Sequence, residues 1–241
     1  MSASTDRHPF LRPAWEYRPG ADVDREPPAG LLAVQEIAIQ VAEATVGAVA
    51  PGRTEVELEV AAAEKMRELG AAGIWTITNV GAGEGGLECF PTATATDREV
   101  GAADVVTIDV HPISQTGFWG DCTRTAVLGT DPGLSESLAE LEDIHVRTLG
   151  ACRPGMPAQE LFGHCAELLR AADFELLDAL GNIGHSLAAG AAYVDGFIDA
   201  ANATPMWAAW AIEPFVGRDG RGYKVEDVVW FGRDACTVVG R

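Results

Sequence analysis

The chain has 241 residues, of which 36 are acidic and 17 basic, giving a formal net charge of −19 at pH 7. Hydrophobic residues make up 47% and charged residues 22%, values typical of a globular protein with a sizeable core. A chain this acidic, without a cluster of lysine and arginine, is expected to bind neither nucleic acid nor an anionic membrane surface.

The N-terminal segment and the cysteines bear on location. The N-terminus lacks the apolar stretch of a secretory signal, and no uninterrupted apolar run reaches the ~20 residues of a membrane span. The five cysteines are scattered without a C-x-x-C pair, which favours reduced thiols over a disulfide framework. We therefore expect a cytoplasmic protein with an extended arm over residues 1–29, rich in Pro, Arg and Asp, and one domain over residues 30–241.

Hydrophobic patterns predict both helices and strands. Apolar residues at helical spacing predict helices over residues 30–50, 54–70 and 135–151. Alternating or apolar segments predict strands over residues 73–80, 104–110 and 123–129. Thr54 precedes the second helix and is expected to cap it.

Two segments of the chain resemble each other at a spacing of 103 residues. Both contain Pro-Gly, then Glu-Leu, then a helical pattern, and the matched pairs are Pro51/Pro154, Gly52/Gly155, Glu57/Glu160 and Leu58/Leu161. Four identities in one register favour an internal duplication, with repeats at about 45–129 and 148–241. Two halves with helices ahead of strands predict an α+β fold, in which helices cover one side of an antiparallel sheet and a site lies between the halves.

Four carboxylates and one histidine lie in or beside apolar, strand-like segments. They are Asp109 in TIDV, Asp121 in GDCTRT, His185 in GNIGHSLA, Glu213 in WAIEPF and Glu226 in YKVEDVV, with Asp227 expected to be solvated. Four buried anions would raise one another's pKa values unless cations neutralised them, and two divalent ions would balance four charges. Oxygen ligands with one nitrogen suit Mn, Fe or Co, with Zn as a further option. Such ions lower the pKa of water and so can supply a nucleophile near neutral pH.

In this order the motifs TIDV, GDCTRT, GHSLA, IEPF and VEDVV resemble those of the M24 metallopeptidases, the family of methionine aminopeptidase, aminopeptidase P and prolidase. The resemblance covers the chain from about residue 30 onward. It implies the pita-bread fold, two pseudo-symmetric halves with a curved antiparallel sheet covered by helices. It also implies that Asp109 binds one metal ion, that Asp121 and Glu226 bridge two, and that His185 and Glu213 hold the second.

The sequence departs from this family at two histidines that bind substrate and move protons. The stretch before Asp109 where the first is expected contains no histidine, and Ala192 stands at the place of the second, next to Tyr193. General acid catalysis, worth about 10²–10⁴-fold, would then need another group. His111, two residues after Asp109, is either a further ligand or base on the same strand face or a surface loop histidine. Tyr193 and Glu213 complete the expected catalytic set, and looser candidates are Glu84, Glu88, Cys89 and Asp195.

Two functions fit these residues. The first is a dinuclear-metal hydrolase of the aminopeptidase type, acting on a short peptide or another small amino- or carboxylate-bearing substrate. The second is a non-peptidase metalloenzyme on the same fold, either a C–S or C–N lyase or an iron-dependent oxidative enzyme. A binding protein without catalysis is a third class, which the retained ligand set disfavours. A homodimer is one expectation for the assembly.

Overall fold

The computed structural model describes residues 23–89, 93–187 and 196–241, so most of the expected arm lies outside the described residues. The first part of the chain contains α1 (Ala29–Gly47), α2 (Glu55–Glu68), β1 (Gly73–Ile74), β2 (Asn79–Ala82), the 3₁₀ helix η1 (Gly83–Leu87), β3 (Val105–Val110), β4 (Pro112–Ile113) and β5 (Cys122–Val127). The second part contains α3 (Pro132–Gly150), α4 (Ala158–Ala171), β6 (Glu175–Leu176), β7 (Asn182–Ser186), β8 (Phe197–Asp199), β9 (Ala208–Ile212), β10 (Phe215–Arg218), β11 (Arg221–Lys224), β12 (Asp227–Phe231) and β13 (Cys236–Val238). The three expected helices are confirmed, with ends that differ by a few residues.

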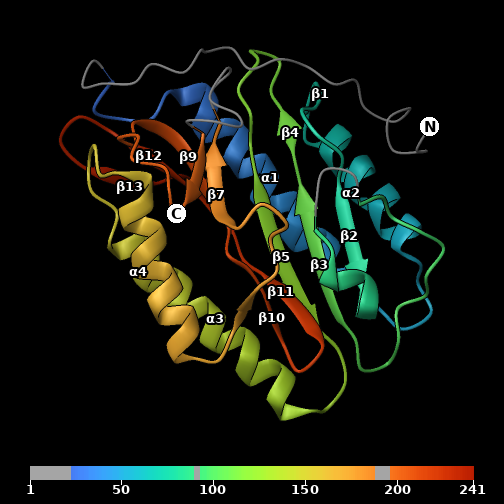
Figure 1. The fold of residues 1–241 in the computed structure, drawn as a ribbon. Coiled ribbons are helices and arrows are strands. Elements are labelled where there is room, and N and C mark those ends of the chain that lie inside the picture. The colour runs from blue at the N-terminus through green and yellow to red at the C-terminus, as the bar shows by residue number, and fades with distance from the viewer. Residues whose placement is uncertain (1–22, 90–92, 188–195) are drawn as a thin grey trace.

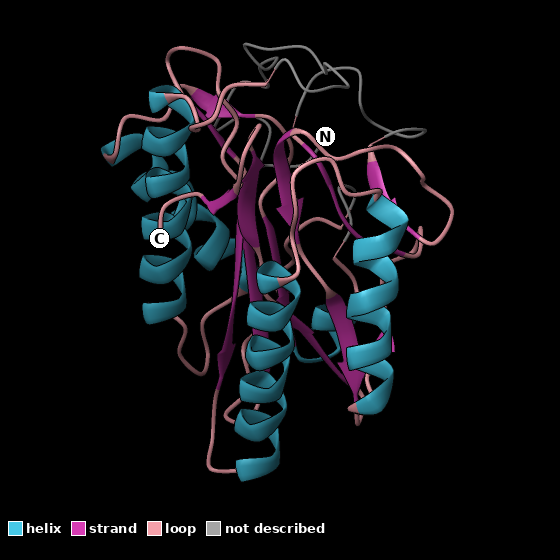
Figure 2. Cartoon of the chain, turned by 90° about the vertical axis from the view of Figure 1, so that its left-hand side faces the viewer, coloured by secondary structure: helices cyan, strands magenta, loops and turns pink. Residues whose placement is uncertain are grey.

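All strand pairings among the described residues are antiparallel. The larger sheets have the orders β2-β3-β5 and β13-β12-β9-β7-β8, and the smaller ones are β1-β4 and β11-β10-β6. α1 lies behind β3 and β5 in Figure 1, while α3 and α4 lie beside each other near the strands of the second part. Figure 2 shows the helices standing around the strands. The expected α+β fold, with antiparallel sheets covered by helices, is confirmed.

The helices and main strands recur at the spacing found in the sequence. α1 and α3 begin 103 residues apart, as do α2 and α4, β2 and β7, and β3 and β9. This regularity supports the proposal of a duplicated half. Because the spacing already holds for α1 and α3, we propose that the repeat begins at residues 29 and 132 rather than 45 and 148. A single domain over residues 30–241 remains a prediction.

The start of α2 has a cap that explains why the helix begins there. The Thr54 hydroxyl accepts a hydrogen bond from the Glu57 N–H (3.2 Å), and the Glu57 carboxylate accepts one from the Thr54 N–H (3.0 Å), which makes a reciprocal cap.

Among the described residues, α1 is the one helix long and apolar enough to cross a membrane, with a mean hydropathy of 1.3. Gln and Glu residues interrupt its sequence, so no continuous apolar run is visible there. It packs against β3 and β5, as a core helix of a globular domain does.

The expected strand over residues 73–80 is wrong as a single element. β1 pairs with β4, whereas β2 pairs with β3, and residues 75–78 bend between them. Trp75 lies in this bend, and its indole N–H donates a hydrogen bond to the carbonyl of Gly120, just before β5 (2.9 Å). Alternation alone does not reveal that the two ends of such a segment join different sheets.

Candidate metal centre

The five residues expected to bind metal come together from both parts of the chain. Asp109 lies on β3, Asp121 just before β5, His185 on β7, Glu213 just after β9 and Glu226 just before β12. Two groups of potential ligands form, namely Asp109, His111 and Asp121, and Asp109, Glu213 and Glu226. Within each group, one ligand atom from every residue lies within 4.8 Å of the others. Long-range strand pairing therefore builds one compact cluster of acidic and histidine side chains.

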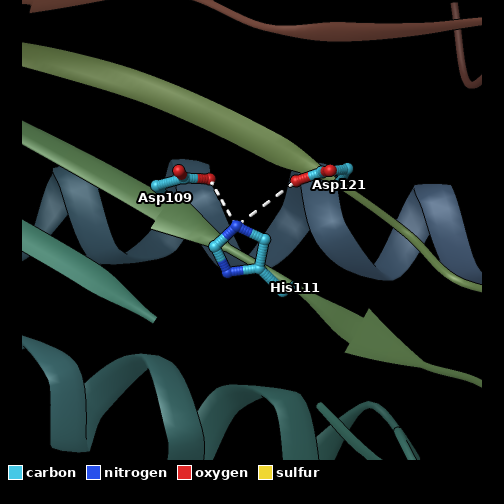
Figure 3. A group of neighbouring side chains, drawn as sticks. All are labelled: Asp109, His111 and Asp121. Carbon is cyan, nitrogen blue, oxygen red and sulfur yellow. Dashed lines mark ion pairs between the residues drawn. The ribbon is translucent and has the colours of Figure 1, made fainter. Parts of the chain in front are cut away.

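His111 lies between the two aspartates. Its Nε2 atom is 3.1 Å from Asp109 Oδ1 and 3.5 Å from Asp121 Oδ1, and Figure 3 shows one ring nitrogen facing both carboxylates. The residue is 5% exposed, so the alternative of a surface loop histidine is wrong. Asp109 and His111 reach the same side because side chains two residues apart along an extended chain share a face.

His185 faces the other side of the cluster. Its Nε2 atom lies 3.3 Å from Glu213 Oε1 and 3.6 Å from Asp121 Oδ2. Its Nδ1 atom lies 3.0 Å from the Ser186 carbonyl oxygen, a contact that makes Nδ1 the donor and leaves Nε2 with a lone pair for a metal. Gly184 permits this arrangement, because it has φ 146° and a Cβ there would collide with the Ala211 carbonyl.

Neighbouring groups hold the backbone of Asp121 and the carboxylate of Glu226. The Gln35 side chain donates to the Asp121 carbonyl (2.6 Å) and accepts from the Asp121 N–H (3.0 Å), so α1 holds the backbone at this position. The Thr123 hydroxyl donates to Glu226 Oε2 (2.7 Å). Partners of this kind orient metal ligands, and their loss usually lowers metal affinity by about 10–100-fold. The sequence interpretation had missed both.

The sequence interpretation also missed Lys224. Its Nζ atom lies 2.8 Å from Asp109 Oδ2 and 2.5 Å from Glu213 Oε2. Burial alone would raise the pKa of Asp109, but the charges of His111 and Lys224 outweigh this effect and lower it well below its ordinary value. A signal was available, because Lys224 stands two residues before Glu226 and an extended chain would direct both to one face.

The buried carboxylate oxygens show that a divalent ion fits this cluster. Asp109 Oδ1, both carboxylate oxygens of Asp121 and Glu226 Oε1 are buried and accept no hydrogen bond from the described residues. Burial and the charges of Glu226 and Asp109 raise the pKa of Asp121 well above its ordinary value, and burial with the charges of Glu213 and Asp109 does the same for Glu226. Unpaired buried anions are costly, and hard cations prefer oxygen ligands.

The raised pKa values predict a pH-dependent response to metal. Without metal, folded Asp121 and Glu226 keep protons that the unfolded chain loses above about pH 4. Their contribution to the free energy of unfolding is therefore greatest near or below pH 4 and falls as the pH rises towards the folded-state pKa values. Because a divalent ion compensates the ionised form, the rise in Tm on adding Mn(II) should grow between pH 5.5 and 7.5. At a fixed Mn(II) concentration that is roughly 100 times Kd at pH 7.5, we expect the rise to reach about 5–10 °C at pH 7.5.

Thermal unfolding in EDTA and in MnCl₂ at the two pH values measures this response. A matched Asp121→Asn variant should show a small Tm increment at both pH values. An increment in the unsubstituted protein that does not change with pH would contradict the assignment of these carboxylates.

Asp227 corrects the expectation of a solvated residue next to Glu226. It is 1% exposed, because β12 lies between β9 and β13 in the interior of the sheet. Its carboxylate lies 2.9 Å from His145 Nε2, 3.2 Å from Arg124 Nη2 and 2.5 Å from Arg241 Nη2. Arg124 also donates to the Glu226 carbonyl (2.6 Å). This ion-pair network therefore joins β5 to the segment before β12 that contains Glu226, a predicted metal ligand.

The remaining sequence candidates have different outcomes. Ala192, Tyr193 and Asp195 lie outside the described residues. Glu84 and Glu88, on and just after η1, are exposed. The Cys89 thiol lies 3.4 Å from Asp109 Oδ2 and so belongs to the cluster. Trp75, which the sequence interpretation had not singled out, stacks on Trp119 at 4.6 Å and faces the rings of His111 and His185 edge-on at 5.0 and 5.6 Å.

Four carboxylates and two histidines lie together beside Trp75, and three of the carboxylates and one histidine are buried. This is the donor set of a carboxylate-rich divalent-metal centre. Residues 29–232 match metallopeptidase family M24, and the chain belongs to that family, which confirms the expected resemblance.

The chain is similar to several dipeptidases and related enzymes. It is 27% identical over 193 residues to the probable dipeptidase PepE of Mycobacterium tuberculosis, a match that covers 78% of this chain and 50% of the relative. Among solved structures, the dipeptidase PepE from Mycobacterium ulcerans is 26% identical, with a TM-score of 0.76 over 90% of this chain and 59% of that one. The prolidase from Pyrococcus horikoshii OT3 shares the fold at 18% identity, with a TM-score of 0.78 over 91% and 63% of the two chains. The chain thus spans half the length of the curated relatives it matches.

Proposed function

We propose that the protein is a divalent-metal-dependent peptidase that cleaves short peptides or other small amino- or carboxylate-bearing substrates. The observation that carries this proposal is the set of four buried carboxylate oxygens without hydrogen-bond partners among the described residues. Family membership and the dipeptidase relatives support hydrolysis of an amide bond. A cytoplasmic location and a homodimer remain predictions.

The proposal assigns roles to the residues of the cluster. Asp109, Asp121, His185, Glu213 and Glu226 hold the metal, with two ions of Mn, Fe or Co at saturation and Zn as a further option. When bound, such ions supply Lewis acidity and water of lowered pKa. Glu213, at 14% side-chain exposure, is the least buried of the carboxylates and is proposed to face the substrate as well.

Proton transfer requires a group other than the two histidines that the sequence lacks. His111 is proposed for this role or as a further ligand, since its Nε2 atom faces both Asp109 and Asp121. Tyr193 remains a second candidate on sequence grounds. Trp75, which stacks on Trp119, lies next to both histidines, and we propose that this aromatic pair contacts the apolar part of a small substrate.

Assays on defined peptides test the proposal. Metal-stripped protein is reloaded with Mn(II), Co(II) or Fe(II) and given Xaa-Pro dipeptides and Met-Xaa peptides, and the release of free amine is measured. We expect metal-dependent cleavage that EDTA abolishes. If the loaded protein is inert on the whole panel but eliminates from a small substrate or consumes dioxygen, the alternative of a lyase or oxidative enzyme replaces peptide hydrolysis.

Replacing His111 by alanine should lower kcat/KM by about 100-fold, whether the ring binds metal or moves a proton. Metal analysis separates the two roles, because loss of a ligand also lowers the metal content, whereas loss of a proton carrier flattens the pH profile at full metal content. His164→Ala, on α4, serves as the control and should change neither quantity. Unchanged turnover and metal content in His111→Ala would remove His111 from the site.

A further inference from the structure

The charged groups around the cluster restrict what a substrate can carry next to the cleaved bond. In a free dipeptide, the C-terminal carboxylate lies close to the nitrogen of the amide that is cleaved. A carboxylate that is brought out of water near other anions is costly unless a cation pairs with it. The cations beside the cluster, and the partners that they already have, therefore bear on the substrate.

The ammonium of Lys224 has no N–H left for a substrate. Among the described residues, Lys224 is the one lysine or arginine whose side chain contacts the side chain of a predicted metal ligand. Its Nζ atom lies 2.8 Å from Asp109 Oδ2, 2.5 Å from Glu213 Oε2 and 3.7 Å from Cys89 Sγ. An ammonium carries three N–H donors, and these three acceptors use all of them. At 5% exposure, Lys224 is held inside the cluster.

Arg124 lies beside the cluster but also has partners already. Its guanidinium donates to the Glu226 carbonyl (2.6 Å) and pairs with the buried Asp227 at 3.2 Å. The two internal stretches outside the described residues, 90–92 and 188–195, contain no lysine, arginine or histidine in the sequence. The described residues around the cluster therefore offer a substrate no free ammonium or guanidinium group.

The two histidines of the cluster do not present a free N–H to solvent either. Their Nε2 atoms face carboxylates, at 3.1 Å from Asp109 Oδ1 for His111 and at 3.3 Å from Glu213 Oε1 for His185. The Nδ1 atom of His185 faces the Ser186 carbonyl oxygen (3.0 Å), and the Nδ1 atom of His111 is buried. Neither ring is thus available to pair with a carboxylate that enters from solvent.

Acidic side chains lie at the same place. Glu88 is exposed and stands directly before Cys89, whose thiol lies 3.4 Å from Asp109 Oδ2. Glu213 has a side chain that is 14% exposed, and the chain as a whole carries a net charge of −19. Like charges brought together at a binding site oppose binding, whereas a substrate amine is attracted.

We propose that the substrate carries a cationic amine and has no carboxylate on the residue that follows the cleaved bond, so that peptide amides and longer peptides are cleaved in preference to free dipeptides. This inference rests on the proposed function and narrows its substrate class. Glu88 and Glu213 attract the amine. Trp75, stacked on Trp119 beside the histidines, supplies an aromatic ring, which is compatible with a cation but gives a carboxylate no compensating charge.

Substrates that differ only at the carboxyl end test the proposal. Metal-loaded protein is given Met-Ala, Met-Ala amide and Met-Ala-Ala, and kcat/KM is measured from the release of methionine. Analogues of the first two, in which a CH₂–NH group replaces the cleaved amide, are titrated by calorimetry, so binding is measured even without turnover. Glu88→Arg places a cation next to the cluster. Glu43→Arg, at an exposed position on α1, is the matched control because it changes the net charge equally.

We expect kcat/KM for the amide and the tripeptide to exceed that for the free dipeptide by at least about 10-fold, and the amide analogue to bind at least about 10-fold more tightly than the acid. Glu88→Arg should lower both ratios, and Glu43→Arg should leave them unchanged. Equal or better cleavage of the free dipeptide would overturn the inference and leave the proposed function standing. If none of the three peptides is cleaved, the proposed function fails and the calorimetric ratio decides the inference. Equal Kd values, or no binding of either analogue, would then overturn it.

Discussion

Replacing Asp121 by asparagine is expected to weaken divalent-metal binding by at least about 100-fold and to lower kcat/KM on peptides by about 10³-fold. Asp121 lies between the two histidines of the cluster, because its Oδ1 atom is 3.5 Å from His111 Nε2 and its Oδ2 atom is 3.6 Å from His185 Nε2. Asparagine keeps the shape of the side chain and the backbone contacts to Gln35. The substitution therefore removes the charge and one of the ligand oxygens without removing the packing.

The same substitution should leave the metal-free protein as stable as before, or more stable. Burial and the charges of Glu226 and Asp109 raise the pKa of Asp121, so keeping this carboxyl group protonated near pH 7 costs free energy in the metal-free protein, and the neutral amide avoids that cost. Calorimetric metal titration and thermal unfolding in EDTA measure the two effects side by side. Asp97→Asn, at an exposed position, is the control and should change neither. A variant that loses activity only because its metal-free form unfolds would contradict the assignment of Asp121 as a ligand.

Replacing Asp227 by asparagine is expected to lower the free energy of unfolding by about 3 kcal/mol, which corresponds to a fall in Tm of about 6–12 °C. The substitution leaves the buried His145 and the partly buried Arg124 without their carboxylate. Burial would raise the pKa of Asp227, but the hydrogen bond and charge of His145 and the charges of Arg124 and Arg241 outweigh it, so the pKa is lowered. This contribution to stability is present above about pH 4 and is lost as the pH falls through the folded-state pKa.

Chemical denaturation in EDTA at pH 7 and at pH 3 measures the loss. The difference between the unsubstituted protein and Asp227→Asn should shrink at the lower pH. Asp234→Asn is the matched control, since Asp234 pairs with Arg25 at the surface, where both side chains are more than half exposed and the pair contributes less than about 1 kcal/mol. Equal losses in the two variants would show that the buried network does not stabilise the fold.

Much of the fold followed from the sequence because its signals were local or repeated. The capped helix after Thr54 and the match of Glu57 to Glu160 depend on a few neighbouring residues and on one spacing. The five residues expected to bind metal lie together, and the expectation came from the cost of carboxylates in apolar strands, which does not depend on which strands bring them there.

The contacts that the sequence did not reveal depend on which strands lie in the interior. In the sequence, Asp227 next to Glu226 resembles a solvated residue. In the structure, β12 lies between β9 and β13, and His145 of α3 contacts the Asp227 carboxylate. Lys224 likewise resembles an exposed lysine in a strand-like run of the sequence, but strands of both parts of the chain enclose it in the structure. The spacing of 103 residues contained part of this information, since it relates Arg124 to Asp227 and Thr123 to Glu226, both of which are in contact.

The central claim is that residues from both parts of the chain share a divalent ion. Anomalous diffraction from crystals soaked in manganese tests it most directly. We expect the strongest peak in bonding contact with the Asp121 carboxylate and within reach of Asp109 and a histidine. Crystals of well-ordered protein without an anomalous peak in this cluster would contradict the claim.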